Sequence, residues 1–354
     1  MRAHLWYVEF VKHAKTFAFV LCLSACGGPQ DGLRRSSDGN ALSGSSGSSK
    51  GSMRDPGGFV TYMVNDTLYR VEAVQGARPV DVSERLSALS EGSDEAPSVS
   101  KNGSWMTIVT TRFGCGEQGC LAVVPRDLSR GSKVLVGRDP IFASGRGAIS
   151  NDGRTIVFTW NEGPHALDLY VTKKGSTDWS KPVLLTADSP FKHNTLPAMN
   201  AAGTQVVFDC GNAPYAEAGT NICRVNTDGS NLKKLLLATG DPLRPGDKTR
   251  ALHHADFGPD GSVIFEADWG GEHVWILPPG SKEPKMFGPG FDNDNSPCVL
   301  PSGHVASLWL GDPEGNGLHE LKVMDRGGGD ALLLTPLDLD VSDVGISCHG
   351  PLSN

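Results

Sequence analysis

The chain has 354 residues with a net charge of −8, and its residues are 38% hydrophobic and 7% aromatic, with 44 Gly and 23 Pro. The negative charge argues against nucleic-acid binding, which depends on neutralising phosphates with Lys and Arg, and against lying flat on anionic lipid. So much Gly and Pro with few aromatic residues indicates many short strands rather than long helices.

Residues 1–25 have the layout of a secretory leader, with basic residues first, then a short apolar run at 17–23, then small residues. The apolar run is too short to span a membrane, which takes roughly 20 apolar residues. Cys26 directly follows Leu23-Ser24-Ala25, an order that resembles the bacterial lipobox. The resemblance implies that residues 1–25 are a signal peptide and that Cys26 is acylated, palmitate included, and becomes the first mature residue. The alternative is a secreted protein without lipid.

The residues after Cys26 bear on where the lipid sits. Lipoproteins of this kind stay in the inner membrane when Asp follows the Cys. Here Gly27 follows, so the resemblance implies the outer membrane, on either its periplasmic or its surface-exposed face. Residues 26–57 are rich in Ser and Gly and nearly lack apolar side chains, so they cannot offset the entropy cost of ordering. They are predicted to be a disordered tether, and residues 58–354 the folded domain.

A repeat of about 50 residues runs through the folded domain. Each copy has a short alternating segment, a tight turn that ends in Gly, and an apolar strand. Turns of the Asn-Gly, Asp-Gly and Ser-Gly kind supply positive φ angles at little cost. The turn glycines are spaced by 50, 50, 58 and 42 residues and are Gly103, Gly153, Gly203, Gly261 and Gly303. Two further short strands follow in each copy, and four antiparallel strands per repeat predict the blade of a β-propeller.

The two ends of the repeat region complete one another. Strands are predicted at 59–64, 67–73 and 77–82 with no first strand before them, and a lone first strand is predicted at 343–348. Joined, they make a sixth blade in which the N- and C-terminal strands close the ring and remove an exposed sheet edge. The prediction is therefore an all-β, six-bladed β-propeller of four-stranded antiparallel blades.

Two repeat segments carry a resemblance to a known family. Asn-Asp-Gly-Arg-Thr-Ile-Val-Phe at 151–158 and Gly-Pro-Asp-Gly-Ser-Val-Ile-Phe at 258–265 resemble the WD40-like repeats of TolB-type propellers, and the resemblance covers residues 59–348. TolB itself has an additional N-terminal α/β domain and is soluble in the periplasm. This chain has a Ser-rich segment in that place, so the partnership of TolB with the Tol–Pal machinery is not carried over.

Six cysteines remain when Cys22 of the leader and Cys26 are set aside. An even number in an oxidising compartment indicates disulfides, for which six Cys allow 15 pairings. Chain positions favour Cys115–Cys120 across one hairpin loop, Cys210–Cys223 on neighbouring strands, and Cys298–Cys348 between the last blade and the closing strand. Zinc at Cys115 and Cys120 is the alternative, but no second Cys or His pair stands near them in sequence.

The residues just before each first strand are expected to crowd around one mouth of the central channel, the default place for a ligand. The candidate ligand-binding residues are Asp94, Glu95, Arg146, His193, His253, His254, Asp294 and Asp343. Such groups could bind zinc or act as general acids and bases, but the favoured interpretation is that they fill a wet channel and bond to loop backbones. Residues 292–296 alternate oxygen ligands as calcium loops do, without the Gly and distal Glu of an EF-hand, so a polar turn is favoured there.

Together these features predict a membrane-anchored lipoprotein whose propeller binds another envelope protein or a ligand without catalysis. We expect a monomer that contacts the membrane through its lipid, with no nucleic-acid partner, metal or cofactor; calcium and zinc are the alternatives. The competing hypothesis is a hydrolase or lyase that acts on an envelope or extracellular polymer through His253, His254 and Asp294 at the mouth.

Overall fold

The computed structural model describes residues 56–213, 218–288, 294–310, 319–329, 331–335, 341 and 346–350. The chain divides into two compact units, Met1–Ser52 and Met53–Asn354, and the described residues all belong to the second. The predicted leader and tether with Cys26 lie outside the described residues, as do Asp343 and residues 292–293 of the calcium-like stretch. In the described part of the chain, no helix has the length and apolar content to cross a bilayer.

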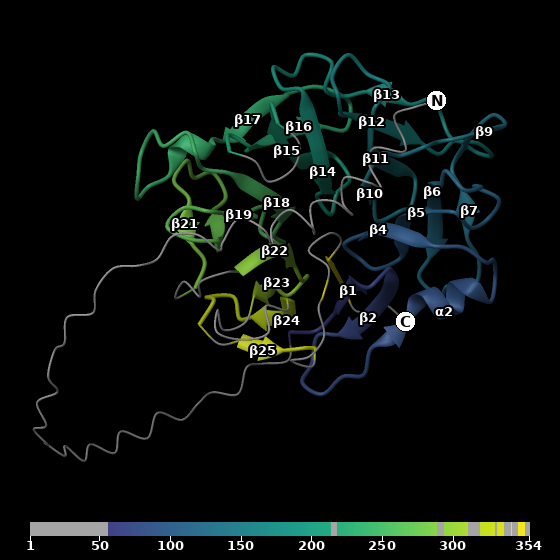
Figure 1. Cartoon of the computed structure of the whole chain (residues 1–354), viewed down its shortest axis with the longest axis horizontal. Coiled ribbons are helices and arrows are strands. Elements are labelled where there is room, and N and C mark those ends of the chain that lie inside the picture. Colours follow the sequence, from purple (N-terminus) through teal and green to yellow (C-terminus); the bar gives the residue numbers. More distant parts are fainter. Residues whose placement is uncertain are drawn as a thin grey trace, which may run out of the picture. The chain divides into compact units, whose positions relative to one another are not determined.

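Six four-stranded antiparallel sheets form the blades of a β-propeller, as predicted (Figure 1). From the innermost strand outward, blade 1 consists of β26 (Ser347–His349), β1 (Phe59–Val64), β2 (Thr67–Glu72) and β3 (Val80–Asp81). Blade 2 consists of β4 (Asp94–Val99), β5 (Trp105–Thr110), β6 (Cys120–Pro125) and β7 (Ser132–Lys133), and a hairpin of β8 (Leu135–Val136) and β9 (Asp139–Pro140) follows it. Blade 3 consists of β10 (Gly147–Ile149), β11 (Thr155–Trp160), β12 (Asp168–Lys173) and β13 (Val183–Leu184).

The remaining three blades continue around the ring. Blade 4 consists of β14 (His193–Met199), β15 (Gln205–Gly211), β16 (Asn221–Asn226) and β17 (Lys233–Leu236). Blade 5 consists of β18 (Leu252–Phe257), β19 (Val263–Ala267), β20 (His273–Leu277) and β21 (Lys285–Met286). Blade 6 consists of β22 (Asp294–Val299), β23 (Val305–Leu310), β24 (His319–Met324) and β25 (Ala331–Leu333). The innermost strands contact their neighbours in a closed circle, in the order β26, β4, β10, β14, β18, β22.

The turn between the first and second strands has one conformation in five blades. Its glycine has a φ between 68° and 85° in each case, at Gly103, Gly153, Gly203, Gly261 and Gly303. The amide of each glycine donates to the carbonyl three residues earlier, at 2.7–3.1 Å. Glycine adopts this left-handed backbone without a steric penalty, so the recurring Gly fixes the hairpin that starts every one of these blades.

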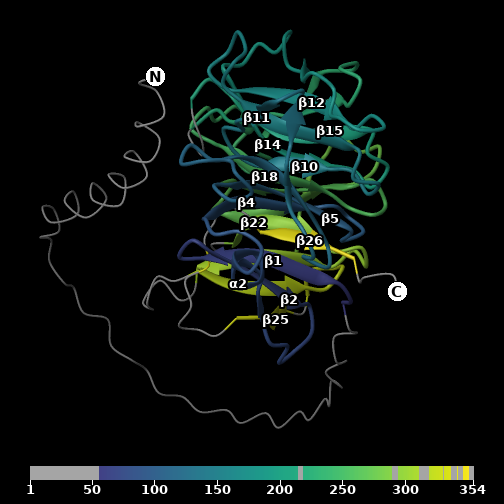
Figure 2. The same ribbon diagram turned by 90° about the vertical axis from the view of Figure 1, so that its right-hand side faces the viewer.

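Apolar side chains from facing blades form the cores between them, and the blades lie stacked face to face in the side view (Figure 2). Between blades 4 and 5, for example, the buried cluster contains Val207, Ile222, Leu252 and Phe265. A single four-stranded blade cannot shelter both of its faces, so each depends on its two neighbours. The ring therefore has to close for the first and last blades to be covered.

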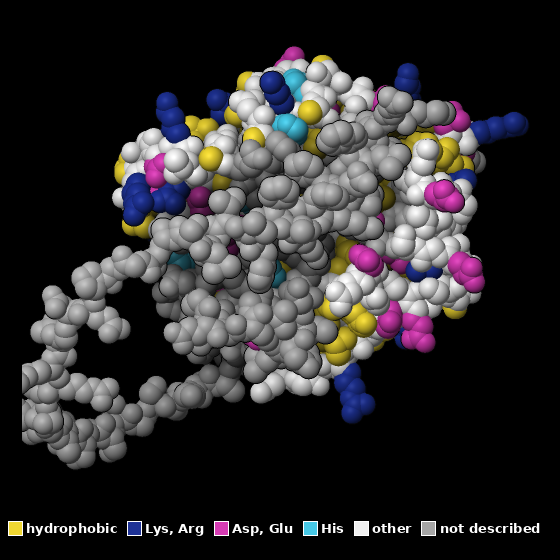
Figure 3. Space-filling model, viewed as in Figure 1, with side chains coloured by type: hydrophobic (Ala, Val, Ile, Leu, Met, Phe, Trp, Pro, Cys, Tyr) yellow, Lys and Arg dark blue, Asp and Glu magenta, His cyan; other side chains and the backbone are white. Residues whose placement is uncertain are grey.

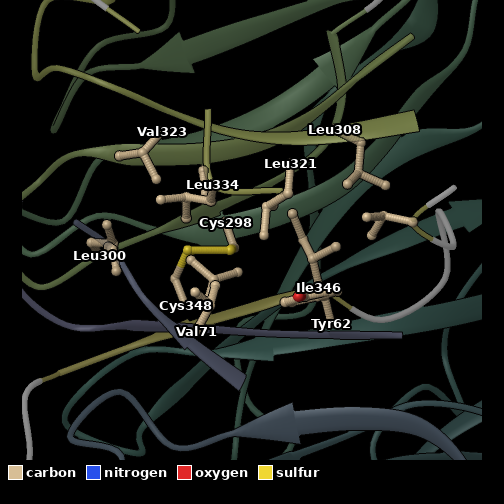
Figure 4. Close-up of a cluster of buried hydrophobic side chains, with 14 of the residues drawn as sticks. Tyr62, Val71, Cys298, Leu300, Leu308, Leu321, Val323, Leu334, Ile346 and Cys348 are labelled. Carbon is tan, nitrogen blue, oxygen red and sulfur yellow. A yellow bond between two sulfur atoms is a disulfide. The ribbon is translucent and has the colours of Figure 1, made fainter. Parts of the chain in front are cut away.

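Closure occurs in blade 1, where β26 pairs antiparallel with β1 and places Phe59 opposite His349 and Val60 opposite Cys348. This confirms the predicted union of the N- and C-terminal strands in one blade. A disulfide joins Cys348 to Cys298 of β22 in blade 6, within a cluster of buried apolar side chains from blades 6 and 1 (Figure 4). The seam of the ring is thus held by backbone pairing, a covalent bond and a shared core.

All three disulfides of the described chain join the pairs that the sequence favours. They are Cys115–Cys120, Cys210–Cys223 and Cys298–Cys348, with Cα–Cα distances of 5.2, 5.9 and 5.4 Å. The first bridges the β5–β6 loop, the second joins β15 to β16, and the third joins two blades. Zinc coordination at Cys115 and Cys120 is not what the structure has.

Blade 1 departs from the prediction at its outer edge. The strand predicted at 77–82 is reduced to β3, and the chain turns into helix α2 (Val82–Ser87). Asp81 is the N-cap, and its Oδ1 accepts a hydrogen bond of 2.7 Å from the amide of Glu84, while Leu86 is fully buried. An acceptor at the N-cap with Glu three positions on is a helix-start signal, and it overrides the strand propensity of Val80 and Val82. A second short element, the 3₁₀ helix η1 (Ala238–Gly240), lies in the long connection between blades 4 and 5.

Candidate functional site

Four of the innermost strands carry a β-bulge near their start, which shapes one mouth of the channel. Each strand shifts register there, and the residues with positive φ, between 47° and 51°, are Ala96, Leu196, His254 and Ser296. A bulge bends its strand and re-aims the side chains beside it. Consecutive residues on either side of the bulge can therefore reach different blades.

His253 of β18 reaches towards blade 4. Its Nδ1 lies 3.3 Å from Oδ2 of Asp209 in β15, and the same oxygen accepts a 3.4 Å hydrogen bond from the amide of His254. His253 and Asp209 are 5% and 3% exposed. Among the described residues, Nε2 of His253 and Oδ1 of Asp209 are buried without a hydrogen-bond partner. The pair is a histidine oriented by a carboxylate, with one ring nitrogen left unused.

His254, the bulge residue itself, reaches the opposite way. Its Nδ1 lies 3.1 Å from Oε2 of Glu266 in β19, and that oxygen also accepts a 2.9 Å hydrogen bond from the amide of Ser296 in blade 6. Burial raises the pKa of Glu266, but the hydrogen bond and charge of His254, the charge of His253 and the Ser296 amide together hold it below its usual value. Glu266 is thus an ionised carboxylate that ties blade 5 to blade 6.

Asp94 and Asp294, predicted to line the mouth, are each paired with a buried cation. Nε of Arg112 lies 3.0 Å from both carboxylate oxygens of Asp94, which also accepts a 2.8 Å hydrogen bond from Oγ1 of Thr110. Lys322 of β24 pairs with Asp294. A buried carboxylate persists when paired and hydrogen-bonded in this way, so these two residues hold their own blades together.

The other predicted mouth residues differ in exposure. Glu95 is exposed, and partial burial together with the charge of Asp66 raises the pKa of its carboxyl group. His193 begins β14, opposite Gly211, and is half-buried. Arg146 directly precedes β10 and lines a cavity in the channel. Asp343 lies outside the described residues.

The far half of the channel, where the first strands end, is crossed by an ion pair. Nζ of Lys101, in the β4–β5 turn, lies 2.7 and 2.6 Å from the two carboxylate oxygens of Asp256 in β18. Blades 2 and 5 stand opposite each other in the ring, so the bond spans it. Hydrogen bonds also join the first turns of blades 2, 3 and 4. The amide of Asn102 donates to the side chain of Asn151, and Nδ2 of Asn151 donates to the carbonyl of Ala201.

A small cavity lies between this ion pair and Arg146. Its walls come from four further innermost strands or turns, and it is lined by Ser98, Val99, Lys101, Arg146, Ala148, Ile149, Ala198, Met199, Asp256, Ser347 and Cys348. It offers the centre of a water molecule a volume of about 20 Å³, enough for about one water. A substrate-sized molecule therefore has no room in this part of the channel.

In the part of the chain that the structure describes, no group of three or more His, Cys, Asp or Glu side chains is placed to hold a metal ion. Asp294 of the calcium-like stretch is engaged by Lys322 instead. On the outer surface in the view of Figure 3, Lys and Arg side chains are interspersed with Asp and Glu around the visible rim.

The sequence did not single out the residues that engage the predicted ones. Asp209 and Glu266 lie on second strands, Arg112 follows a second strand, and Lys322 lies on a third strand. The sequence shows that charged residues occur on these alternating strands, and this was the only indication of a partner. The blade that each charged residue faces depends on β-bulges, for which the sequence has no local motif.

No known protein family and no curated protein sequence matches this chain. Solved structures do match its fold. A chain of a nidogen–laminin complex has a TM-score of 0.56 at 11% identity, with 82% of this chain and 98% of that chain covered. A TolB-type protein from Agrobacterium tumefaciens has a TM-score of 0.53 at 16% identity, covering 83% and 93%.

The likeness is one of fold. It supports a β-propeller fold similar to that of a TolB-type protein, and the six blades are those that the repeats indicate. Hydrazine synthase of Kuenenia stuttgartiensis also matches, with a TM-score of 0.55 at 11% identity, but this chain covers 46% of that protein. Proteins with unrelated roles share the fold, so function has to be argued from the site.

Proposed function

We propose that this chain is a lipid-anchored envelope protein whose propeller is a non-catalytic binding scaffold for another envelope protein or a ligand. The observation that carries the proposal is the state of the channel mouth. Asp94 pairs with Arg112, Asp294 with Lys322, and Glu266 with His254. The channel cavity beside Arg146 has room for about one water. Such a mouth is polar and the charges of these carboxylates are already paired, which suits recognition better than turnover.

The anchor rests on the order Leu23-Ser24-Ala25-Cys26 and on the composition of residues 26–57. A Ser/Gly-rich segment of that length has a root-mean-square span of about 30 Å as a flexible coil. The propeller would be held near the membrane but free to turn its mouth towards a partner. The outer membrane is the proposed location because Gly27, not Asp, follows the lipidated Cys.

Metabolic labelling tests the anchor. Cells that produce the full chain are grown with an alkyne fatty acid, and label on the protein is compared with that on Cys26→Ser and Cys22→Ser. We expect label on the unmodified chain and on Cys22→Ser, which keeps the lipobox Cys, and none on Cys26→Ser. Label that survives in Cys26→Ser contradicts the proposed acylation site.

Site-specific crosslinking in intact cells tests the scaffold role. A photoreactive residue is placed at Glu95, exposed at the mouth, or at Val183, which is 58% exposed on the outer strand β13. We expect a discrete envelope protein to be crosslinked from position 95 and not from position 183. Equal products from both positions, or none from position 95, would remove the mouth as the binding surface.

One observation favours a second candidate, a hydrolase or lyase that acts on a polymer. The Asp209–His253 pair, with Nε2 of His253 unused among the described residues, has the form of an oriented general base. His253→Gln separates the two functions, because Gln keeps hydrogen bonding but cannot transfer a proton in this role. Each variant is expressed in a strain that lacks this chain, and any envelope defect of that strain is the readout. The scaffold predicts that His253→Gln repairs the defect as well as the unmodified chain does, with crosslinking from position 95 unchanged. The enzyme predicts that His253→Gln fails to repair the defect although crosslinking is retained.

A further inference from the structure

Among the residues that the structure describes, none forms a hydrogen bond or ion pair with the guanidinium of Arg146. Its side chain lines the channel cavity, and its Nε is buried with no hydrogen-bond partner among the described residues. No described carboxylate lies within ion-pair distance of it. A guanidinium carries five N–H donors and remains charged in proteins, and leaving such donors unmet in a buried place is costly. This arrangement leaves them available to something that enters the channel.

The carboxylates that act on the charge of Arg146, those of Asp256 and Asp209, are hydrogen-bonded to other residues. Burial lowers the pKa of Arg146, and the charges of Asp256 and Asp209 act in the other direction from a distance. Asp256 is held by Lys101 and by the amides of Phe257 and Val299, each at 2.9 Å. Asp209 directs Oδ2 to His253. Arg146 therefore has balancing charge around it, but no described residue makes a direct contact that occupies its donors.

The Lys101–Asp256 ion pair crosses the channel on the side where the first strands finish, and Asn102 and Asn151 join neighbouring turns there. A ligand that approaches Arg146 from the mouth, at the other end of these strands, would pass His193 and His253 at the starts of β14 and β18. The room left beside Arg146 is that of one water, so only a small acceptor group can reach it.

We propose that the channel binds a carboxylate group on Arg146. A carboxylate presents two planar oxygens that match the guanidinium fork. It is also small enough for one oxygen to replace the cavity water while the body of the ligand stays in the mouth. A phosphate is bulkier and carries more negative charge, which Asp209 and Asp256 oppose. The carboxylate comes either from a free small acid or from a chain of the partner, and the inference rests on the proposed scaffold function, to which it gives a ligand chemistry.

Binding to the detergent-purified full chain tests the proposal. The probes are sodium acetate, N-acetylglycylglycine and its C-terminal amide, each at constant ionic strength set with chloride. Saturable binding is followed by line broadening of isotope-labelled probe and by the rise in melting temperature that a ligand of the folded state produces. The variants are Arg146→Gln, Arg146→Lys and, as the matched control, Arg138→Gln, whose arginine is exposed in the β8–β9 hairpin.

We expect the dipeptide acid to bind the unmodified chain and Arg138→Gln with equal affinity, and the amide not to bind. Arg146→Gln should lower the affinity for the dipeptide acid at least about tenfold. Arg146→Lys keeps a point charge without the guanidinium fork, so its affinity should lie between those of the unmodified chain and Arg146→Gln. Acetate binding as well assigns the source to free small acids, and binding of the dipeptide acid alone assigns it to a chain end. Absence of saturable binding, or equal affinity in a folded Arg146→Gln, overturns the proposal and leaves Arg146 as a counter-charge to Asp209. Crosslinking from position 95 is independent of this result, so failure here is distinguishable from failure of the scaffold function.

Discussion

Lys101 and Asp256 face each other across the channel, with the lysine Nζ 2.7 and 2.6 Å from the two carboxylate oxygens. Their side chains are 17% and 11% exposed. Since β4 and β18 are opposite members of the inner circle, this bond ties together blades that share no sheet and no side-by-side core. The ion pair therefore links blades 2 and 5 directly across the channel.

Replacing Lys101 with Met should lower the free energy of unfolding by about 3 kcal/mol, because it leaves the Asp256 carboxylate in a largely buried place without its cation. Chemical denaturation of the full chain measures this change. The double variant Lys101→Met/Asp256→Asn removes both charges and should recover most of the loss. A Lys101→Met protein as stable as the unmodified chain would show that the pair contributes nothing to the ring.

The three disulfides should differ in what they contribute to stability. They close loops with sequence separations of 50, 13 and 5 residues, and the chain-entropy model gives about 4, 3 and 2 kcal/mol for such loops. Paired Cys→Ser variants should therefore lose stability in the order Cys298/Cys348, Cys210/Cys223, Cys115/Cys120. Thermal and denaturant unfolding of the three variants checks the order, and a Cys115/Cys120 variant less stable than the Cys298/Cys348 variant reverses it.

Most of the fold could be predicted because its signals are local. The recurring Gly of the first turn, from Gly103 to Gly303, needs positive φ wherever it stands, and the number of repeats fixes the number of blades. The pairing of Cys298 with Cys348 follows once both are placed on innermost strands next to the closure. The error at residues 77–82 is also local, because the cap formed by Asp81 and Glu84 starts a helix where β-branched residues favour a strand.

The sequence predicted which candidate residues stand at the starts of innermost strands, but it did not predict their contacts. Residues chosen by counting back from the turn glycines do cluster on the starts of the innermost strands, as His253 and Asp294 show. Their partners are set by ring geometry: Asp209 meets His253 only because blade 4 faces blade 5, and the bulge at His254 sends consecutive histidines in opposite directions. A pattern read along one strand contains neither fact.

His349, at the closing strand, is expected to make the stability of the ring depend on pH in the acid range. It is 1% exposed, its ring stacks on Phe59 with centroids 5.6 Å apart, and Nε2 lies 3.3 Å from Oγ1 of Thr61. Burial, with the charges of Arg70 and Arg126, lowers the pKa of His349 to about 3, against the carbonyl of Gly350, which acts in the other direction. The folded protein therefore keeps this ring neutral well into the acid range.

Because the folded pKa lies below the unfolded value of 6.5, the unfolded chain binds this proton first as the pH falls. Stability is retained above pH 6.5 and declines between about pH 6.5 and pH 3, by up to about 1.4 kcal/mol per pH unit. Unfolding free energies across this range, compared with those of His349→Gln, isolate the contribution. The variant has no ring to protonate, so its stability should depend less steeply on pH; parallel curves would assign the acid sensitivity to other groups.

Asp94 and Glu95 are consecutive residues that should respond in opposite ways to removal of their charge. Asp94 is 1% exposed and holds Arg112, which is 2% exposed, at 3.0 Å from both oxygens. Asp94→Asn leaves that guanidinium buried without its counter-charge and should cost about 3 kcal/mol of unfolding free energy. Glu95→Gln, at an exposed position, should change stability by less than about 0.5 kcal/mol.

Binding should show the reverse order. Crosslinking to the partner, measured from a photoreactive residue at a third mouth position such as His193, should survive Asp94→Asn in the folded fraction and should still form, but more slowly, in Glu95→Gln. This is because only Glu95 of the two presents its charge to an approaching surface, and charges at the edge of an interface act on the rate of association. If Asp94→Asn left stability unchanged and abolished crosslinking, Asp94 would be a contact for the partner and not a support of blade 2.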